Sequence, residues 1–331
     1  MGGSHWTPDV LGTPYERLEL ELAPDAEGPV VATLVRRVRD EVIDGPGRFD
    51  VLYVHGWSDY FFQRELAEYW VRRGARFHAL DLRKYGRSLR PHQTPGYVDD
   101  LAAYDEELDA AIDVIRTRGV EPLVLMGHST GGLTLSLWAA RHPDVADGLV
   151  LNAPWLEFQT RAVGRAILEP MVQVGAVIHP HAPFPEVDLG FYSRTVSAEL
   201  GGEWTYEREW RPEHGFRTSR GWLNAVLRGH ATVAKGLGIR IPVLVLLSAR
   251  SMLQPVWSEQ MRFADTAIDV GGVARRAADL GSDVWIRRIE GALHDVTLSA
   301  APARAAVWES LDRWLPAVIR AASPAGSGVS G

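Results

Sequence analysis

The sequence predicts an α/β fold, and three observations support this prediction. Short, continuously apolar runs alternate with stretches of helical pattern along most of the chain. Strands of this kind are typical of a parallel sheet that helices cover on both faces. The composition, 46% hydrophobic and 23% charged, is that of an ordinary globular protein. No internal repeat of roughly 20 to 50 residues points to a solenoid or a propeller instead.

The predicted elements follow one another as strand, turn and helix. The predicted strands are residues 51–54, 77–82, 122–126, 149–151, 241–247 and 284–289. The predicted helices are residues 61–73, 97–118, 133–141 and 303–321. The longest helix has five apolar residues at helical spacing on one face, namely Leu101, Tyr104, Leu108, Ala111 and Ile115.

Residues 153–238 interrupt this alternation. The segment contains scattered prolines, many arginines and no strand of the buried type, and its tryptophans include Trp155, Trp204, Trp210 and Trp222. A structureless loop of this length would be unusual, so we expect an inserted helical lid. The predicted organisation is an N-terminal core part (1–152), the lid (153–238), a C-terminal core part (239–321) and a disordered tail (322–331).

Charge and composition exclude several classes of function. The formal net charge of −7 gives no electrostatic reason to expect nucleic acid or an anionic membrane as partner. No apolar run approaches the roughly 20 residues that cross a bilayer, and residues 1–10 do not resemble a secretory signal. The chain has no cysteine, which excludes disulfides, thiolate catalysis and Cys-ligated metals. We expect a cytoplasmic protein and predict no metal site.

The candidate nucleophile is Ser129, in the run Gly127-His128-Ser129-Thr130-Gly131. This run matches G-x-S-x-G, a turn in which a strand passes abruptly into a helix and leaves the serine hydroxyl exposed above the sheet. Glycine is common enough that such a match arises by chance, but here a buried strand enters the turn and a helix leaves it. The alternative is a glycine-rich turn with an idle serine.

A serine hydroxyl needs a base, and His294 is the candidate. In folds with this turn the triad follows in the order serine, acid, histidine, with the histidine after the last strand. His294 directly follows the predicted strand 284–289, whereas His55 and His128 belong to earlier turns. His55 is expected to be a structural hydrogen-bonding residue. The alternative for His294 is a surface loop histidine.

The acid should follow the predicted strand 241–247, where it can orient the imidazole. None of the five residues after that strand is acidic, and the first carboxylates are Glu259, Asp265 and Asp269. We favour Asp265, because Asp265-Thr266-Ala267-Ile268 has the pattern of an acid followed by an apolar anchor at the start of a helix. Glu259 and Asp269 remain alternatives, and each of the three could be a solvated surface carboxylate.

Acyl transfer also needs donors for the developing oxyanion. The backbone N–H of Thr130, next to the serine, is one candidate, and that of Trp57, after His55-Gly56, is the other. His128, Tyr60 and Trp155 are the candidate substrate-binding residues.

Together these residues resemble the serine-hydrolase branch of the α/β-hydrolase superfamily, and more narrowly its monoacylglycerol lipase, lysophospholipase and serine-aminopeptidase-like group. The matching stretches are His55-Gly56, residues 81–88, residues 127–132 and residues 291–294. The sequence departs from the group in the loop 57–60, which replaces the usual Gly-Glu-His, and in an apparent insertion over 251–264 before the acid.

The resemblance implies a mostly parallel, eight-stranded-type sheet, a Ser-acid-His triad, an acyl-serine intermediate, no cofactor and a lid. The predicted function is hydrolysis of a small or medium apolar carboxylic ester. Amide, peptide or lactone hydrolysis by the same triad is the alternative, because the sequence does not distinguish these leaving groups. A non-catalytic protein of the same fold is a third hypothesis, although it would be expected to have lost Ser129, His294 or the glycines of the turn.

Overall fold

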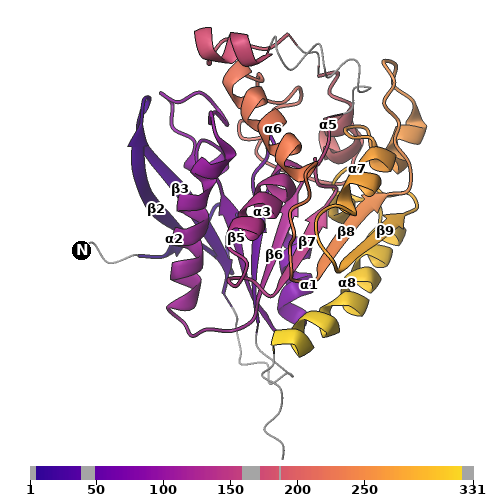
Figure 1. The fold of residues 1–331 in the computed structure, drawn as a ribbon. Helices are drawn as coiled ribbons and strands as arrows, with labels where there is room; N and C mark the ends of the chain where they lie inside the picture. Colours follow the sequence, from indigo (N-terminus) through magenta and orange to yellow (C-terminus); the bar gives the residue numbers. More distant parts are fainter. Residues whose placement is uncertain (1–4, 39–48, 159–171, 186–187, 323–331) are drawn as a thin grey trace, which may run out of the picture.

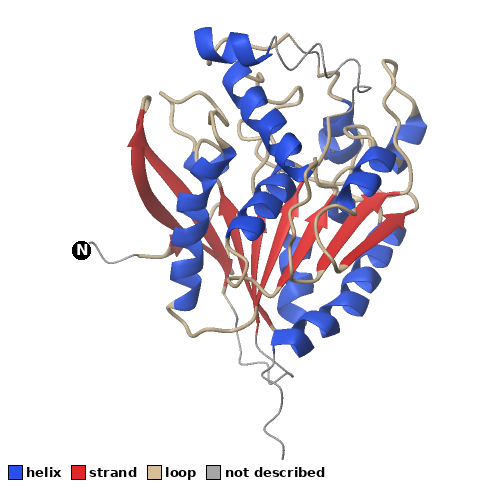
Figure 2. Ribbon diagram, in the orientation of Figure 1, coloured by secondary structure: helices blue, strands red, loops and turns tan. Residues whose placement is uncertain are grey.

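One nine-stranded sheet runs through the molecule, with helices packed on both of its faces (Figures 1 and 2). The computed structural model describes residues 5–38, 49–158, 172–185 and 188–322. The strand order is β1-β2-β3-β5-β4-β6-β7-β8-β9. The α/β class and the α/β-hydrolase architecture predicted from the sequence are therefore confirmed.

The strands are β1 (Thr7–Pro8), β2 (Tyr15–Asp25), β3 (Gly28–Arg37), β4 (Phe49–Val54), β5 (Ala75–Asp81), β6 (Leu123–His128), β7 (Gly148–Asn152), β8 (Val243–Ser248) and β9 (Val284–Ile289). The α-helices whose two ends both lie within the described residues are α1 (Arg64–Arg72), α2 (Asp105–Arg116), α3 (Thr130–Arg141), α5 (Phe191–Val196), α6 (Arg220–Val233), α7 (Val270–Ala277) and α8 (Ala301–Ala322). Short 3-10 helices are η1 (Gly86–Ser88), η2 (Leu101–Tyr104), η3 (Ala198–Leu200), η4 (Glu259–Phe263) and η5 (Val296–Leu298).

The sheet is parallel from β5 to β9 and antiparallel at its N-terminal edge. Strands β5, β4, β6, β7, β8 and β9 pair in parallel, whereas β3 pairs antiparallel with both β2 and β5. The sheet thus has nine strands where the resemblance implied eight. Continuously apolar runs predict no strand before residue 51, and β2 is not found among them because its residues alternate between buried and exposed instead of forming such a run.

Two hydrophobic cores lie on opposite faces of the sheet. Alternate residues of a strand point to opposite faces, so Leu52 and Val54 of β4 join one core and Val51 and Tyr53 the other. The first core contains residues of α2, α3, α6 and α7, and the second contains residues of α1 and α8. Figure 1 shows the two sets of helices on the two sides of the sheet.

The described residues of the connection between β7 and β8 (153–242) lie above the carboxyl ends of the parallel strands (Figure 1). Its described part contains α5, η3 and α6. Helix α6 packs on α3, so this connection rests on the core next to the serine turn. The predicted lid boundaries, 153 and 238, fall within it, and the role of a lid stays a prediction. Residue 322 ends α8, and the rest of the predicted tail lies outside the described residues.

Candidate active site

Ser129 lies between β6 and α3, as the sequence predicts for the strand–turn–helix context. Its backbone has φ +51° and ψ −115°, a conformation that non-glycine residues rarely adopt and that costs about 1 to 3 kcal/mol. Hydrogen bonds hold this conformation in place. The Ser129 N–H donates to the Asn152 carbonyl at 3.0 Å, and the Ser129 carbonyl accepts from the Trp155 N–H at 3.0 Å.

The glycines of the turn are required because backbone segments approach them closely. A Cβ atom on Gly131 would lie 2.2 Å from the His55 carbonyl oxygen and 2.6 Å from that of Val54. A Cβ on Gly127 would lie 2.7 Å from backbone atoms of Gly131. These close approaches bring the first turn of α3 against the end of β4, so the hydroxyl stands at the carboxyl edge of the sheet.

The structure brings Ser129, His294 and Asp265 together in a chain of hydrogen bonds. His294 Nε2 is 3.0 Å from Ser129 Oγ, and His294 Nδ1 is 2.9 Å from Asp265 Oδ2. Asp265 is fully buried, and the exposed fractions of His294 and Ser129 are 3% and 9%. With Asp265 ionised, the imidazole carries its hydrogen on Nδ1, which leaves the Nε2 lone pair directed at the serine hydroxyl.

Asp265 reaches this position because residues 252–264 form a loop, an excursion from the end of β8, whose two ends are paired. The backbone of Asp265 pairs with that of Ser251: the Asp265 N–H donates to the Arg250 carbonyl, and the Asp265 carbonyl accepts from the Met252 N–H. The acid therefore stands next to the end of β8, although 17 positions separate it from Ser248 in the sequence. The backbone N–H groups of Ala267 and Ile268 donate to its other carboxylate oxygen and fix its orientation.

The two alternative acids have other contacts. Asp269 is the N-cap of α7, and its carboxylate accepts from the Gly271 N–H. Glu259 has an exposed side chain that pairs with Arg262 at 2.8 Å and accepts from the Trp257 indole N–H. Asp265 is the candidate acid whose carboxylate contacts His294.

One candidate oxyanion donor follows Ser129 in the chain, and the other belongs to the loop after β4. Thr130 is the first residue of α3, and Trp57 follows Gly56, at which a Cβ would lie 3.0 Å from the Ser129 Cβ. The Trp57 ring stacks at an angle on that of Trp222 from α6, with centroids 3.7 Å apart. The oxyanion role of the two N–H groups stays a prediction.

His55 makes two hydrogen bonds within the core. Its Nδ1 faces the Gly56 carbonyl at 2.7 Å, and its Nε2 accepts from the Leu82 N–H at 3.1 Å. Burial lowers the pKa of this ring below its ordinary value. His55 is therefore a neutral residue that ties the loops after β4 and β5 together.

The three candidate substrate-binding residues differ in their surroundings. The ring of buried His128 lies 5.0 Å from that of His294, and among the described residues neither of its nitrogens makes a hydrogen bond. Trp155 is half-buried and packs near Trp222. Tyr60 is buried, and its hydroxyl accepts from the Glu207 N–H at 2.7 Å. Their roles toward a substrate stay predictions.

Three polar side chains around the site, those of Asp59, Arg211 and Tyr192, are not among the residues that the sequence predicts for it. Asp59 pairs with Arg211 at 3.2 Å, and its other oxygen lies 3.6 Å from His128 Nδ1. The ring of Tyr192, from α5, meets that of His294 edge-on at 5.1 Å. Asp59 and Arg211 lie in polar stretches that would normally be exposed, so only the fold reveals that these two residues are buried.

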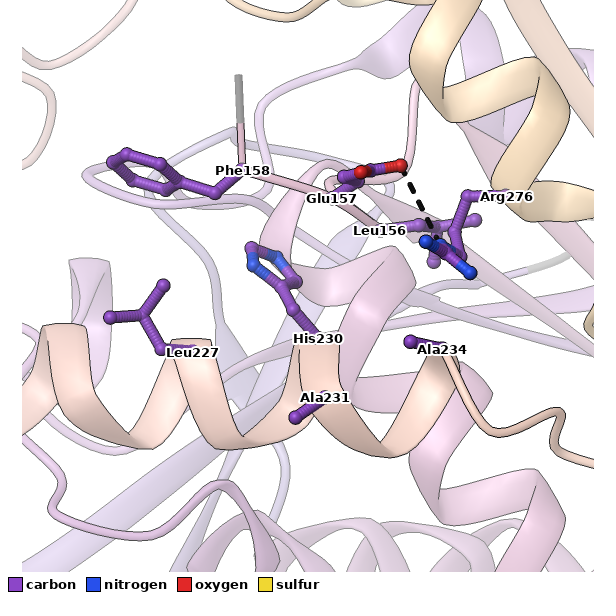
Figure 3. A pocket seen from close by; sticks show the side chains of 8 residues that line it. All are labelled: Leu156, Glu157, Phe158, Leu227, His230, Ala231, Ala234 and Arg276. Atoms are coloured by element: carbon purple, nitrogen blue, oxygen red, sulfur yellow. Dashed lines mark ion pairs between the residues drawn. The ribbon is translucent and has the colours of Figure 1, made fainter. Parts of the chain in front are cut away.

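One pocket of the described residues is separate from the hydrogen-bonded chain, and Figure 3 shows the side chains that line it. It is lined by Leu156, Glu157, Phe158, Leu227, His230, Ala231, Ala234 and Arg276. Arg276 and Glu157 form an ion pair at 3.6 Å on one side, and Phe158 and Leu227 lie on the other (Figure 3). None of the residues of the hydrogen-bonded chain lines this pocket, so we assign it no part in the chemistry.

The described residues were searched for membrane-spanning helices and for metal sites. They contain no helix long and apolar enough to cross a membrane. Within the same residues, no three His, Cys, Asp or Glu side chains are grouped so that they could hold a metal ion.

Comparisons with known proteins agree with this architecture. Residues 46–298 match the Hydrolase_4 family, described as serine aminopeptidase, S33. The AB hydrolase superfamily protein YisY of Bacillus subtilis (strain 168) is 28% identical over 236 residues, 64% of this chain and 77% of that protein.

Solved structures share the fold at lower identity. A soluble variant of the Saccharomyces cerevisiae monoglyceride lipase superposes with a TM-score of 0.63 at 17% identity, over 91% of this chain and 96% of that one. The monoacylglycerol lipase of Paleococcus ferrophilus superposes with a TM-score of 0.59 at 20% identity, over 81% and 94% of the two chains. The chain belongs to the Hydrolase_4 (serine aminopeptidase, S33) family and is a hydrolase of the α/β-hydrolase superfamily.

Proposed function

We propose that the protein hydrolyses a carboxylic ester through an acyl-serine intermediate on Ser129. The observation that carries the proposal is the continuous chain from Ser129 Oγ through the His294 ring to Asp265, with links of 3.0 and 2.9 Å. These distances are within the range at which a base can take the serine proton. The strained, glycine-bounded turn of Ser129 supports the same role.

The reaction proceeds in two halves. Ser129 Oγ bonds to the ester carbonyl carbon while its proton passes to His294 Nε2, and Asp265 stabilises the resulting imidazolium. Thr130 N–H and Trp57 N–H bind the oxyanion. His294 then gives the proton to the alkoxide as the ester C–O bond breaks. In the second half, water gives a proton to His294 and bonds to the acyl carbon; the bond from that carbon to Ser129 Oγ then breaks as His294 returns the proton to Oγ, and the carboxylic acid leaves.

The surroundings of Ser129 favour an apolar acyl or aryl group. The ring of Trp57 packs against those of Trp222 and Phe216, and Trp155 packs near Trp222. Aromatic side chains offer large apolar contact areas. The monoglyceride and monoacylglycerol lipases among the structural neighbours support an ester of small or medium size, and we infer that residues 153–238 act as the lid over it.

The alternative is hydrolysis of an amide or a peptide with the same residues. The description of the family as serine aminopeptidase favours this second candidate. Both reactions share the acyl-serine step and differ in the leaving group, which is an amine in place of an alcohol.

The first test is the hydrolysis of a p-nitrophenyl ester series by wild type and by Ser129→Ala. We expect turnover by wild type that vanishes in this variant, with a chain-length preference that measures the acyl site. Ser136→Ala is the matched control, because Ser136 is also buried in α3 and donates to the Gly132 carbonyl. The control should keep the wild-type rate.

If wild type hydrolyses none of the esters, labelling of Ser129 with a fluorophosphonate distinguishes the remaining explanations. If wild type hydrolyses no ester but Ser129 is labelled, the activated serine serves an amide, peptide or lactone. If Ser129 is neither active nor labelled, the proposal is wrong and a non-catalytic protein of this fold becomes the better description.

A further inference from the structure

Asp295, the residue after the proposed base, is a fully buried carboxylate held by neutral donors. Its Oδ1 accepts from Asn152 Nδ2 at 2.6 Å, from the Thr297 hydroxyl at 2.6 Å and from the Thr297 N–H at 2.9 Å. Its Oδ2 accepts from Gln63 Nε2 at 3.2 Å. Amide, hydroxyl and peptide donors stabilise an anion without neutralising it, so the negative charge acts on the groups around it.

The same carboxylate fastens the loop of His294 to two central strands. Asn152 ends β7, and its side chain donates to Asp295 and accepts from the Val296 N–H at 3.0 Å. Gln63 also donates to the hydroxyl of Tyr53 on β4 at 3.1 Å. Since the Asn152 carbonyl accepts from the Ser129 N–H, this one residue connects the loops of the proposed nucleophile and the proposed base.

We propose that Asp295 is a positioning residue for His294: its anionic carboxylate fixes the loop of the base and stabilises the protonated ring during the reaction. This inference rests on the proposed role of His294 as base. Asp265 contacts the ring directly, so Asp295 acts as a second, fixed negative charge. The Asp295 charge interacts with His128 and Tyr192, whose rings lie 5.0 and 5.1 Å from that of His294, so it acts within the group of side chains that surrounds the base.

Other ionisable groups surround Asp295 and His294, and they influence whether the Asp295 carboxyl group is ionised. They are Tyr53 on β4, Asp59 in the loop after β4, His128 at the end of β6, Tyr192 on α5, Arg211 before α6, and Asp265. Burial alone raises the pKa of Asp295, but the charge of His128 and the hydrogen bonds from Thr297 and Asn152 hold it below its ordinary value. The carboxylate therefore stays ionised wherever a histidine base is active.

The test is Asp295→Asn, which removes the charge and keeps the shape. The substitution weakens the hydrogen bonds that hold the loop of His294 in place. We therefore expect kcat on a p-nitrophenyl ester to fall roughly 10- to 100-fold. The acidic limb of the kcat/KM profile should also move to lower pH, by about one unit, because the protonated ring has lost a stabilising anion. A purely structural role would lower kcat and leave the limb in place, and that outcome would overturn the proposal.

Thr297→Val is the matched control, because it removes one neutral donor and keeps the carboxylate. We expect the acidic limb of this variant to coincide with that of wild type. If Asp295→Asn does not fold, Asp295→Ser carries the same test, since a serine hydroxyl can still accept from the Thr297 N–H at the start of η5.

A measurement without substrate separates this inference from the proposed function. The pH titration of the His294 ring by NMR should have a lower midpoint in Asp295→Asn than in wild type. An unchanged midpoint refutes the electrostatic role even if the enzyme is fully active. Retained turnover in Ser129→Ala refutes the proposed function, whatever the titration shows.

Discussion

Asp265 shows how a residue can be distant in sequence from its partner and yet be ideally placed. The excursion 252–264 separates it from β8, but backbone pairing with Ser251 brings it back to the strand end. Both of its oxygens are occupied, one by the His294 ring and the other by two backbone N–H groups. The carboxylate therefore has a fixed direction before any substrate binds.

At this scale the first prediction concerns Asp265→Asn. The amide oxygen can keep the bonds from the Ala267 and Ile268 N–H groups, so the amide nitrogen faces His294 and forces the hydrogen of the ring onto Nε2. A ring in that tautomer cannot accept the serine proton, and kcat should fall about 10⁴-fold. Asp269→Asn is the control and should keep the wild-type rate. Circular dichroism should show the same fold in both variants, and a near-normal rate in Asp265→Asn would contradict the assignment.

The second prediction concerns His78, which is buried on β5. Burial, together with the charge of nearby Arg76, lowers the pKa of its ring to about 3. In the unfolded chain a histidine titrates near 6.5, so between about pH 6.5 and 3 the unfolded state binds a proton that the folded state excludes. Stability is therefore lost as the pH falls through this window, by roughly 2 kcal/mol at pH 5.

Urea unfolding at pH 7 and pH 5 checks this. His78→Leu should reduce the difference in unfolding free energy between the two pH values by roughly 2 kcal/mol. His92→Leu, at an exposed position, should leave the difference as in wild type. Equal differences in all three proteins would show that His78 does not contribute to the acid sensitivity.

At the scale of elements, the contact between α3 and β4 sets the position of the serine. The first turn of α3 approaches the last carbonyls of β4 so closely that only a hydrogen atom fits at Gly131. Gly131→Ala must push the helix away from the sheet, which should destabilise the protein by about 1 to 3 kcal/mol and displace the hydroxyl from His294. Urea unfolding and ester turnover measure the two effects.

Gly175→Ala is the control for this helix contact. Gly175 lies in the helical stretch 172–178, and its added Cβ would meet the flexible side chain of Arg220 at 2.9 Å. Since that side chain can move and alanine favours helix, stability should be unchanged or higher. Equal losses in both variants would show that crowding at Gly131 has no special effect.

The elements of the core could be predicted because their hydrophobic pattern is strong. Strand β8 has six consecutive buried residues, and its predicted bounds differ from the observed ones by two residues at the start and one at the end. Strand β2 is not predicted by continuous apolar runs, because Leu18, Leu20 and Leu22 alternate with glutamates. An alternating pattern is the mark of a strand with one solvated face.

Some residues around the serine could be predicted from the sequence and others could not. Ser129 and His294 occupy positions that local chain order identifies, next to a strand and a turn. Asp59, Arg211 and Asp295 could not be identified, because a polar side chain in a loop is normally exposed. Their burial results from packing between segments far apart in the chain, which no local pattern records.

At the scale of the whole molecule, a buried ion pair joins the β7–β8 connection to the core. Arg211 and Asp59 are each almost completely buried and lie 3.2 Å apart. Breaking one partner leaves an uncompensated buried charge, so Arg211→Met should cost about 3 to 5 kcal/mol of unfolding free energy. The double variant Asp59→Asn/Arg211→Met should recover most of this loss. Denaturant unfolding of the four proteins of this cycle measures the coupling, and additive losses would contradict it.

The hydrogen bond between His294 and Ser129 joins positions 165 residues apart. Contacts this distant form only after the chain between them has been made and packed. During translation, therefore, Ser129 emerges from the ribosome long before His294. On the proposed mechanism, the nascent polypeptide carries no activated serine until β8 and β9 have joined the edge of the sheet, so the direction of synthesis sets when reactivity begins.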